Sequence, residues 1–112
     1  VLANKIHCFE PFGYLDFLNL LANAKVVFTD SGGIQEETTV LDIPCITLRD
    51  TTERPITLTE GTNILVHDNP AKIIKAANQA LNGEKKPGRC PEIWDGNTAE
   101  RIVKILAERS IN

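Results

Sequence analysis

The sequence has no methionine, only three cysteines and few aromatic residues, which make up 5% of its 112 positions. The cysteines are Cys8, Cys45 and Cys90, and no two of them form a CxxC pair. Neither a disulfide framework nor a zinc site is therefore expected. Cys8 and Cys45 lie in apolar runs, which predicts two small buried side chains. Such cysteine usage is typical of a reducing compartment, and we expect a cytoplasmic protein.

Excess positive charge and long apolar runs are also missing. Twelve basic against 15 acidic residues give a net charge of −3. The sequence therefore lacks the excess of positive charge that binds a phosphate backbone, and no nucleic-acid partner is expected. No apolar run approaches the roughly 18 residues of a membrane helix, and residues 1–5 lack a signal-peptide core. No membrane association is therefore expected. The length predicts one domain or part of one, and the first residue, Val1, favours a cut within a longer protein over a processed start.

Short apolar runs alternate with segments of helical periodicity, which predicts an α/β fold with a parallel sheet. Strands are expected over residues 5–9, 26–29, 45–48 and 63–66, because these runs are rich in Val, Ile and Phe without alternation. Helices are expected over residues 14–23, from 31 or 32 to before Pro44, over 70–81 and over 98–109. Asn69 and Gly83 would cap the third helix. The buried stripes of the last two helices would be Ile73, Ile74, Ala77 and Leu81, and Ala99, Ile102, Val103 and Leu106.

The strongest local signal is TDSGGIQEE at residues 29–37, where an expected strand ends and a helix begins. Ligands of open α/β sheets bind at this edge, and the first turn of a helix offers free N–H groups to an anion. Gly32 and Gly33 have no Cβ, so a phosphate could approach the backbone. Ser31 could cap the helix or donate its hydroxyl to the same anion. A tight turn capped by Ser31, with no ligand, is an equally good interpretation.

Glu37 strengthens the ligand hypothesis. At about 100° per residue, it falls at the edge of a buried face, whereas Gln35 and Glu36 point away. That face carries Ile34, Thr38 and Leu41. A carboxylate in this place needs hydroxyl or cation partners, and a ribose would supply two hydroxyls. The alternative is a glutamate whose carboxylate reaches water.

A second polar cluster, RDTTERP at residues 49–55, follows the third expected strand and so lies at the same edge of the sheet. Arg49 and Arg54 could pair with a diphosphate, or the segment could be a solvated loop with local ion pairs. Tyr14 and Phe17 could flank a base or simply pack.

These motifs carry a resemblance to a known family. The stretches DSGGIQEE (30–37), TERP (52–55) and GTN (61–63), with Pro11, Tyr14, Phe17, Pro44 and Arg49, resemble the non-hydrolysing UDP-N-acetylglucosamine 2-epimerases. The resemblance implies a GT-B architecture, in which two Rossmann-like domains hold a UDP-sugar between them. Residues 1–112 would then be a partial C-terminal Rossmann-like domain, with a parallel sheet flanked by helices.

The resemblance also implies roles for individual residues. Ser31, Gly32 and Gly33 would hold the diphosphate, and Glu37 the ribose hydroxyls. Phe17 would lie beside the uracil, and Arg54 would line the cleft near the phosphates. No cofactor or metal is implied, the partner is a UDP-sugar, and the parent protein would be a homodimer.

The implied reaction interconverts UDP-GlcNAc and UDP-ManNAc by elimination of UDP and its re-addition with C2 inverted. This requires a base near C2, and the sequence offers no obvious catalytic residue for it. Ile56 also stands where the family usually has Glu after TERP. A GT-B glycosyltransferase domain and a non-catalytic sugar-nucleotide-binding module remain alternatives, although the TERP stretch favours the epimerase.

Overall fold

The computed structural model describes residues 5–110, and its centre is a three-stranded parallel sheet. The strands β1 (Val27–Thr29), β2 (Cys45–Thr47) and β3 (Asn63–Leu65) are hydrogen-bonded in the order β1-β2-β3. The strands are in register from their first residues: Val27 is paired with Cys45, and Cys45 with Asn63. The expected parallel α/β arrangement is confirmed for these three runs.

Five helices accompany the sheet in residues 5–110: α1 (Tyr14–Ala22), α2 (Gly32–Leu41), α3 (Pro55–Thr59), α4 (Pro70–Leu81) and α5 (Thr98–Ser110). Four of them are the helices that the periodicity predicts. The short α3 was not expected, although proline at its first position is a common helix start. In α4, the Asn69 side chain accepts a hydrogen bond from the Lys72 N–H at 3.2 Å, and Gly83 has a φ of +79° just beyond the helix.

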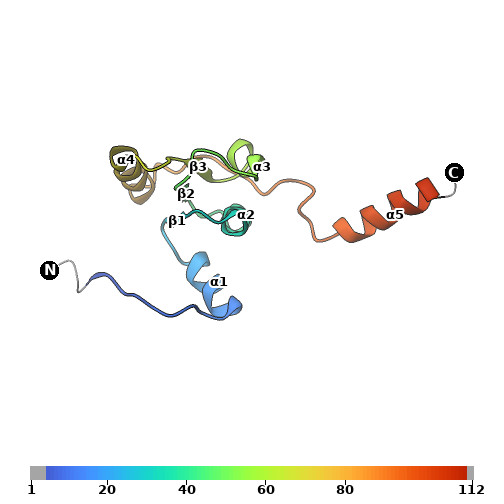
Figure 1. Cartoon of the computed structure of the whole chain (residues 1–112), viewed down its shortest axis with the longest axis horizontal. Coiled ribbons are helices and arrows are strands. Elements are labelled where there is room, and N and C mark those ends of the chain that lie inside the picture. The colour runs from blue at the N-terminus through green and yellow to red at the C-terminus, as the bar shows by residue number, and fades with distance from the viewer. Residues whose placement is uncertain (1–4, 111–112) are drawn as a thin grey trace.

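The two faces of the sheet differ in chemistry. Helix α4 covers one face, where Ile46 of β2 packs with Val66 and Ala76 in an apolar cluster. Helix α2 contacts all three strands, and Figure 1 shows α2 and α4 on either side of them. The buried residues under α2 are polar, namely Gln35, Thr38, Thr39, Thr47 and Asn63.

The run at residues 5–9 is not a strand, which corrects the prediction. Ile6 and Phe9 are 64% and 70% exposed, and Cys8 is exposed rather than buried. A strand needs the N–H and C=O groups of a neighbour. In the structure, this segment leads into α1 without lying along β1 (Figure 1).

Two predicted apolar stripes are also corrected. On α4, Ala76 is buried and Ile73 and Ala77 pack beside it, whereas Ile74 and Leu81 are mostly exposed. No residue of α5 is buried. Its expected face is uncovered because the helix stands away from the sheet (Figure 1), so Ile102, Val103 and Leu106 lie in the open.

An irregular connection links α4 to α5, as the sequence predicts. Trp94 in this connection is half-buried against α1 and α2, where it lines a cavity with Tyr14 and Leu41. None of the helices within residues 5–110 is both long and apolar enough to cross a membrane.

Candidate functional site

The candidate site lies where β1 ends and α2 begins. Ser31 is the N-cap residue of α2, with extended backbone angles of −90° and 129°. Its N–H donates to the Thr29 hydroxyl at 3.0 Å. Within residues 5–110 its own side chain makes no capping hydrogen bond, so the expected cap is not formed and the exposed Ser31 hydroxyl is free for another acceptor or donor.

The two glycines have different surroundings. A Cβ on Gly32 would lie 2.8 Å from the Glu53 carboxylate and 3.7 Å from Arg54 Cγ, so the 49–55 segment lies directly against the first turn of α2. A Cβ on Gly33 would have the Ser31 hydroxyl, 3.9 Å away, as its nearest neighbour. The turn is therefore closed on the side of Gly32 and open on the side of Gly33.

Arg54 lies over this first turn. Its Nε donates to the Glu36 carboxylate, and its backbone N–H donates to the Thr52 hydroxyl at 3.0 Å. Glu36 therefore does not point freely into solvent, which corrects the helical-wheel prediction. Both side chains are about two-fifths exposed, so the pair contributes little stability, about 0–1 kcal/mol. Its effect is to keep a guanidinium beside the free N–H groups of α2.

Glu37 lies on the side of α2 that faces α1. It is half-buried and lines a cavity of about 320 Å³ together with Tyr14, Leu18 and Trp94. Phe17 is also half-buried, and it lies along α1 between Tyr14 and Leu18, which line the cavity. The structure therefore brings together Ser31, Gly32, Gly33 and Arg54 at the turn, and it places Glu37 on the side of α2 that faces α1.

Gln35 is the clearest correction to the helical wheel. It is fully buried, and its side-chain oxygen Oε1 accepts hydrogen bonds from the Thr52 hydroxyl at 2.5 Å and from Asn63 Nδ2 at 3.0 Å. The buried face of α2 is centred on Gln35, Thr38 and Thr39. Gln35 finds a partner in Asn63 of the sheet, whereas the two threonine hydroxyls donate to backbone carbonyls of α2 itself.

This network continues into the sheet. Asn63 accepts a hydrogen bond from the Thr47 hydroxyl at 2.5 Å and donates to the Thr57 hydroxyl at 3.0 Å. Sequence reasoning missed it, because the strand pattern treats each run as uniformly apolar. The available signal was a polar residue inside each of two such runs, Thr47 and Asn63.

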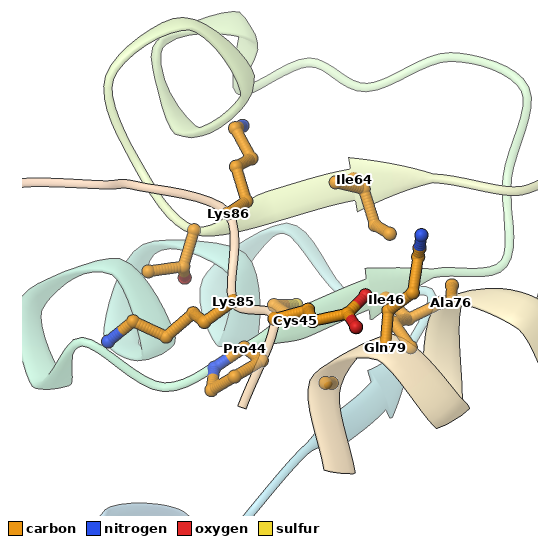
Figure 2. Close-up of a pocket in the computed structure, with 11 residues that line it drawn as sticks. Pro44, Cys45, Ile46, Ile64, Ala76, Gln79, Lys85 and Lys86 are labelled. Atoms are coloured by element: carbon orange, nitrogen blue, oxygen red, sulfur yellow. The ribbon is translucent and has the colours of Figure 1, made fainter. Parts of the chain in front are cut away.

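A different cavity, of about 160 Å³, lies at the edge of the sheet where β2 begins (Figure 2). Pro44, Cys45 and Ala76 line it, with two lysines from the connection after α4. Lys86 donates to the Leu58 carbonyl and, at 2.8 Å, to the Asn63 carbonyl. Burial lowers the pKa of Lys86. Lys85 pairs with Asp42 at 2.6 Å, so both ammonium groups bind protein oxygens and hold the connection to the body.

The parallel sheet, with α2 opening at its carboxyl edge, defines a Rossmann-like α/β domain of the GT-B type. A family model described as UDP-N-acetylglucosamine 2-epimerase matches residues 1–107. The chain is 54% identical over 102 residues to the UDP-N-acetylglucosamine 2-epimerase of Methanocaldococcus jannaschii, covering 91% of this chain and 27% of that protein. The chain belongs to the UDP-N-acetylglucosamine 2-epimerase family.

Solved structures agree with this assignment. The crystal structure of the M. jannaschii enzyme in complex with UDP-GlcNAc and UDP is 51% identical, with a TM-score of 0.72, over 89% of this chain and 27% of that one. The Neisseria meningitidis enzyme bound to UDP-GlcNAc is 36% identical, with a TM-score of 0.79, over 91% and 29%. The chain thus spans less than a third of the length of these relatives.

Proposed function

We propose that this chain holds the UDP moiety of UDP-N-acetylglucosamine in a 2-epimerase that interconverts UDP-GlcNAc and UDP-ManNAc. The observation that carries the proposal is the open first turn of α2 with Arg54 beside it, in a family of which two solved members have UDP-GlcNAc bound. Residues 1–112 would form part of the C-terminal domain, at the carboxyl edge of whose sheet nucleotides bind.

Each site residue has a proposed role. The Ser31 hydroxyl and the N–H groups of Gly32 and Gly33 would bind the diphosphate, whose charge suits the helix N-terminus. The Arg54 guanidinium would add a charge-assisted hydrogen bond to the same phosphates. Glu37 would accept hydrogen bonds from the ribose hydroxyls, and Phe17 would lie beside the uracil.

The proposed reaction eliminates UDP and the C2 proton to leave a C1–C2 double bond, then adds UDP back to C1 while a proton returns to the opposite face of C2, which inverts C2. Removal of the C2 proton requires a base, which we assign to no residue of this chain. The contribution of this chain would be electrostatic, since Arg54 and the N–H groups of α2 stabilise the charge that builds on the departing UDP. We propose a homodimer in the cytoplasm, where free cysteines such as Cys45 and Cys90 stay reduced.

The products distinguish this activity from its closest alternative. NMR of UDP-GlcNAc incubated with the parent protein should reveal UDP-ManNAc at equilibrium with the substrate. The 112-residue chain alone, in which we assign no base, should show no turnover. Release of UDP that depends on an added sugar acceptor, with no UDP-ManNAc, would instead indicate a GT-B glycosyltransferase.

Glu37→Gln tests the ribose assignment. The substitution keeps the size of the side chain but removes the charge, and charge-assisted hydrogen bonds contribute about 1.5–3 kcal/mol each. The affinity for UDP should fall about tenfold to a hundredfold, whereas that for inorganic pyrophosphate, which has no ribose, should hardly change. Titration calorimetry measures both.

The matched control is Glu108→Gln, because Glu108 is an exposed residue of α5. Glu36 is unsuitable as a control, since it pairs with Arg54 beside the proposed phosphate site. Equal losses of UDP and pyrophosphate binding in Glu37→Gln, or the same effect from Glu108→Gln, would contradict the ribose assignment.

A further inference from the structure

Thr52 connects the proposed phosphate site to the interior of the protein. Its single hydroxyl donates to the side-chain oxygen Oε1 of Gln35 at 2.5 Å and accepts a hydrogen bond from the Arg54 backbone N–H at 3.0 Å. One oxygen therefore joins the second turn of α2 to the backbone of the arginine that lies over the first turn. Thr52 itself is half-buried, whereas Gln35 is fully buried.

The interior end of this connection is fixed. Gln35 also accepts from Asn63, and Asn63 bonds to Thr47 on β2 and Thr57 on α3. These four side chains are each fully buried. Because buried polar groups cost free energy unless they are paired, such a network permits few alternative arrangements.

The network does more than α2 packing requires. An apolar residue at position 35 could cover the sheet, and burying an amide without a partner for every hydrogen is costly. Gln35 Nε2 has no partner among residues 5–110, so the buried amide is destabilising on that side. Its Oε1 nevertheless keeps the hydrogen bond from Thr52. What the polar side chain adds is a fixed position for the 49–55 segment.

We infer that the Gln35–Thr52 hydrogen bond positions the proposed diphosphate site. It holds the Arg54 backbone so that the guanidinium lies beside the first turn of α2, where Glu53 already packs against Gly32. Gln35 and Thr52 are positioning residues that need not touch the ligand. The inference rests on the proposed function, because it names the groups that hold the UDP site in shape.

Preorganisation determines the expected effect. If Arg54 is held in place before the ligand arrives, binding loses no conformational entropy in ordering the 49–55 segment. Loosening this segment should weaken every ligand that uses the phosphate site, by about tenfold. UDP and inorganic pyrophosphate should therefore be affected alike, in contrast to Glu37→Gln.

The test compares Thr52→Val with Thr52→Ser. Valine keeps the shape of threonine but removes both hydrogen bonds, whereas serine retains the hydroxyl. Thr59→Val is the matched control, because Thr59 is exposed on α3 and its hydroxyl faces only carbonyls of its own helix, at 3.5 Å. Two quantities are measured in the protein: the affinities for UDP and pyrophosphate, and the hydrogen exchange of the Arg54 amide.

We expect Thr52→Val to speed Arg54 exchange and to weaken both ligands about tenfold, with Thr52→Ser and Thr59→Val close to the wild type. Faster exchange without loss of either ligand would overturn the positioning role and leave the proposed function standing. Unchanged exchange in Thr52→Val would overturn it as well. A wild-type protein that binds neither ligand would overturn the proposed function, and this inference with it.

Discussion

The interior beneath α2 and the surface of α5 invert the usual distribution of side chains. Gln35 and Thr38 on α2 are completely buried, whereas Val103 and Leu106 on α5 are 65% and 62% exposed. The threonines of α2 return their hydroxyls to the helix, as Thr38 does to the Ile34 carbonyl at 2.8 Å. In this chain, a side chain is buried where it finds hydrogen-bonding or packing partners, and whether it is polar or apolar matters less.

The contrast separates two kinds of information in a sequence. The period of the apolar residues predicts α5 to within one residue, since it reports local geometry. Whether the apolar face is covered depends on another segment being there to cover it, and within residues 5–110 α5 has none.

Breaking the interior network should have the largest effect. Asn63→Ala leaves Thr47, Thr57 and Gln35 without their shared partner, and each buried group that loses a hydrogen bond costs about 1–3 kcal/mol. We expect the free energy of unfolding to fall by about 3 kcal/mol in denaturant titrations.

The counterpart on the outer helix is Leu106→Ala. Although it removes a large apolar side chain, Leu106 is mostly exposed, so the loss should stay within about 0.5 kcal/mol. Similar losses for Asn63→Ala and Leu106→Ala would mean that α5 packs on the body and that the comparison is wrong.

Sequence reasoning placed all three strands and four of the five helices found within residues 5–110, because apolar runs, caps and glycines are local signals. It also located the Ser31–Gly33 turn, since the carboxyl ends of parallel strands share an edge. It misplaced residues 5–9, whose strand would need a neighbour, and Gln35, whose partners Thr52 and Asn63 lie 17 and 28 positions away. Pairwise contacts over such distances leave no periodic trace.

A second experiment makes the same substitution beneath α2 and at an open position outside the interior. A Cβ on Gly61 would clash with the Thr39 side chain and lie 2.8 Å from the Thr57 carbonyl. Overpacking of this kind costs about 1–3 kcal/mol, so Gly61→Ala should lower the free energy of unfolding by about 2 kcal/mol. Gly13, at the start of α1, has open space around it. There, Gly13→Ala changes only the capping preference, with a cost below about 1 kcal/mol. Equal melting curves for the two variants would show that the α2 face is loosely packed.

The smallest effect concerns the buried cysteine. Burial raises the pKa of the Cys45 thiol, and hydrogen bonds with Thr38 and Thr47 oppose this rise in part. The folded state therefore holds its proton more tightly than the unfolded state does. This contribution to stability is complete below the ordinary thiol pKa and declines as pH rises from that value towards the raised one.

At a pH equal to the ordinary thiol pKa, half of the unfolded thiols have lost their proton, which costs the folded state about 0.4 kcal/mol. The contribution of Cys45 to the free energy of unfolding should therefore fall by no more than this amount between about pH 7 and about pH 9. Lys86 acts in the opposite sense, because its lowered pKa favours the folded state as pH rises. Cys45→Ala keeps this contribution, so subtracting the pH dependence of Cys45→Ala from that of the wild type isolates the contribution of Cys45. Cys8→Ser, at an exposed position, should keep the full decline. If Cys45→Ala and the wild type declined in parallel, Cys45 would titrate equally in both states, and the interior beneath α2 would be open to water.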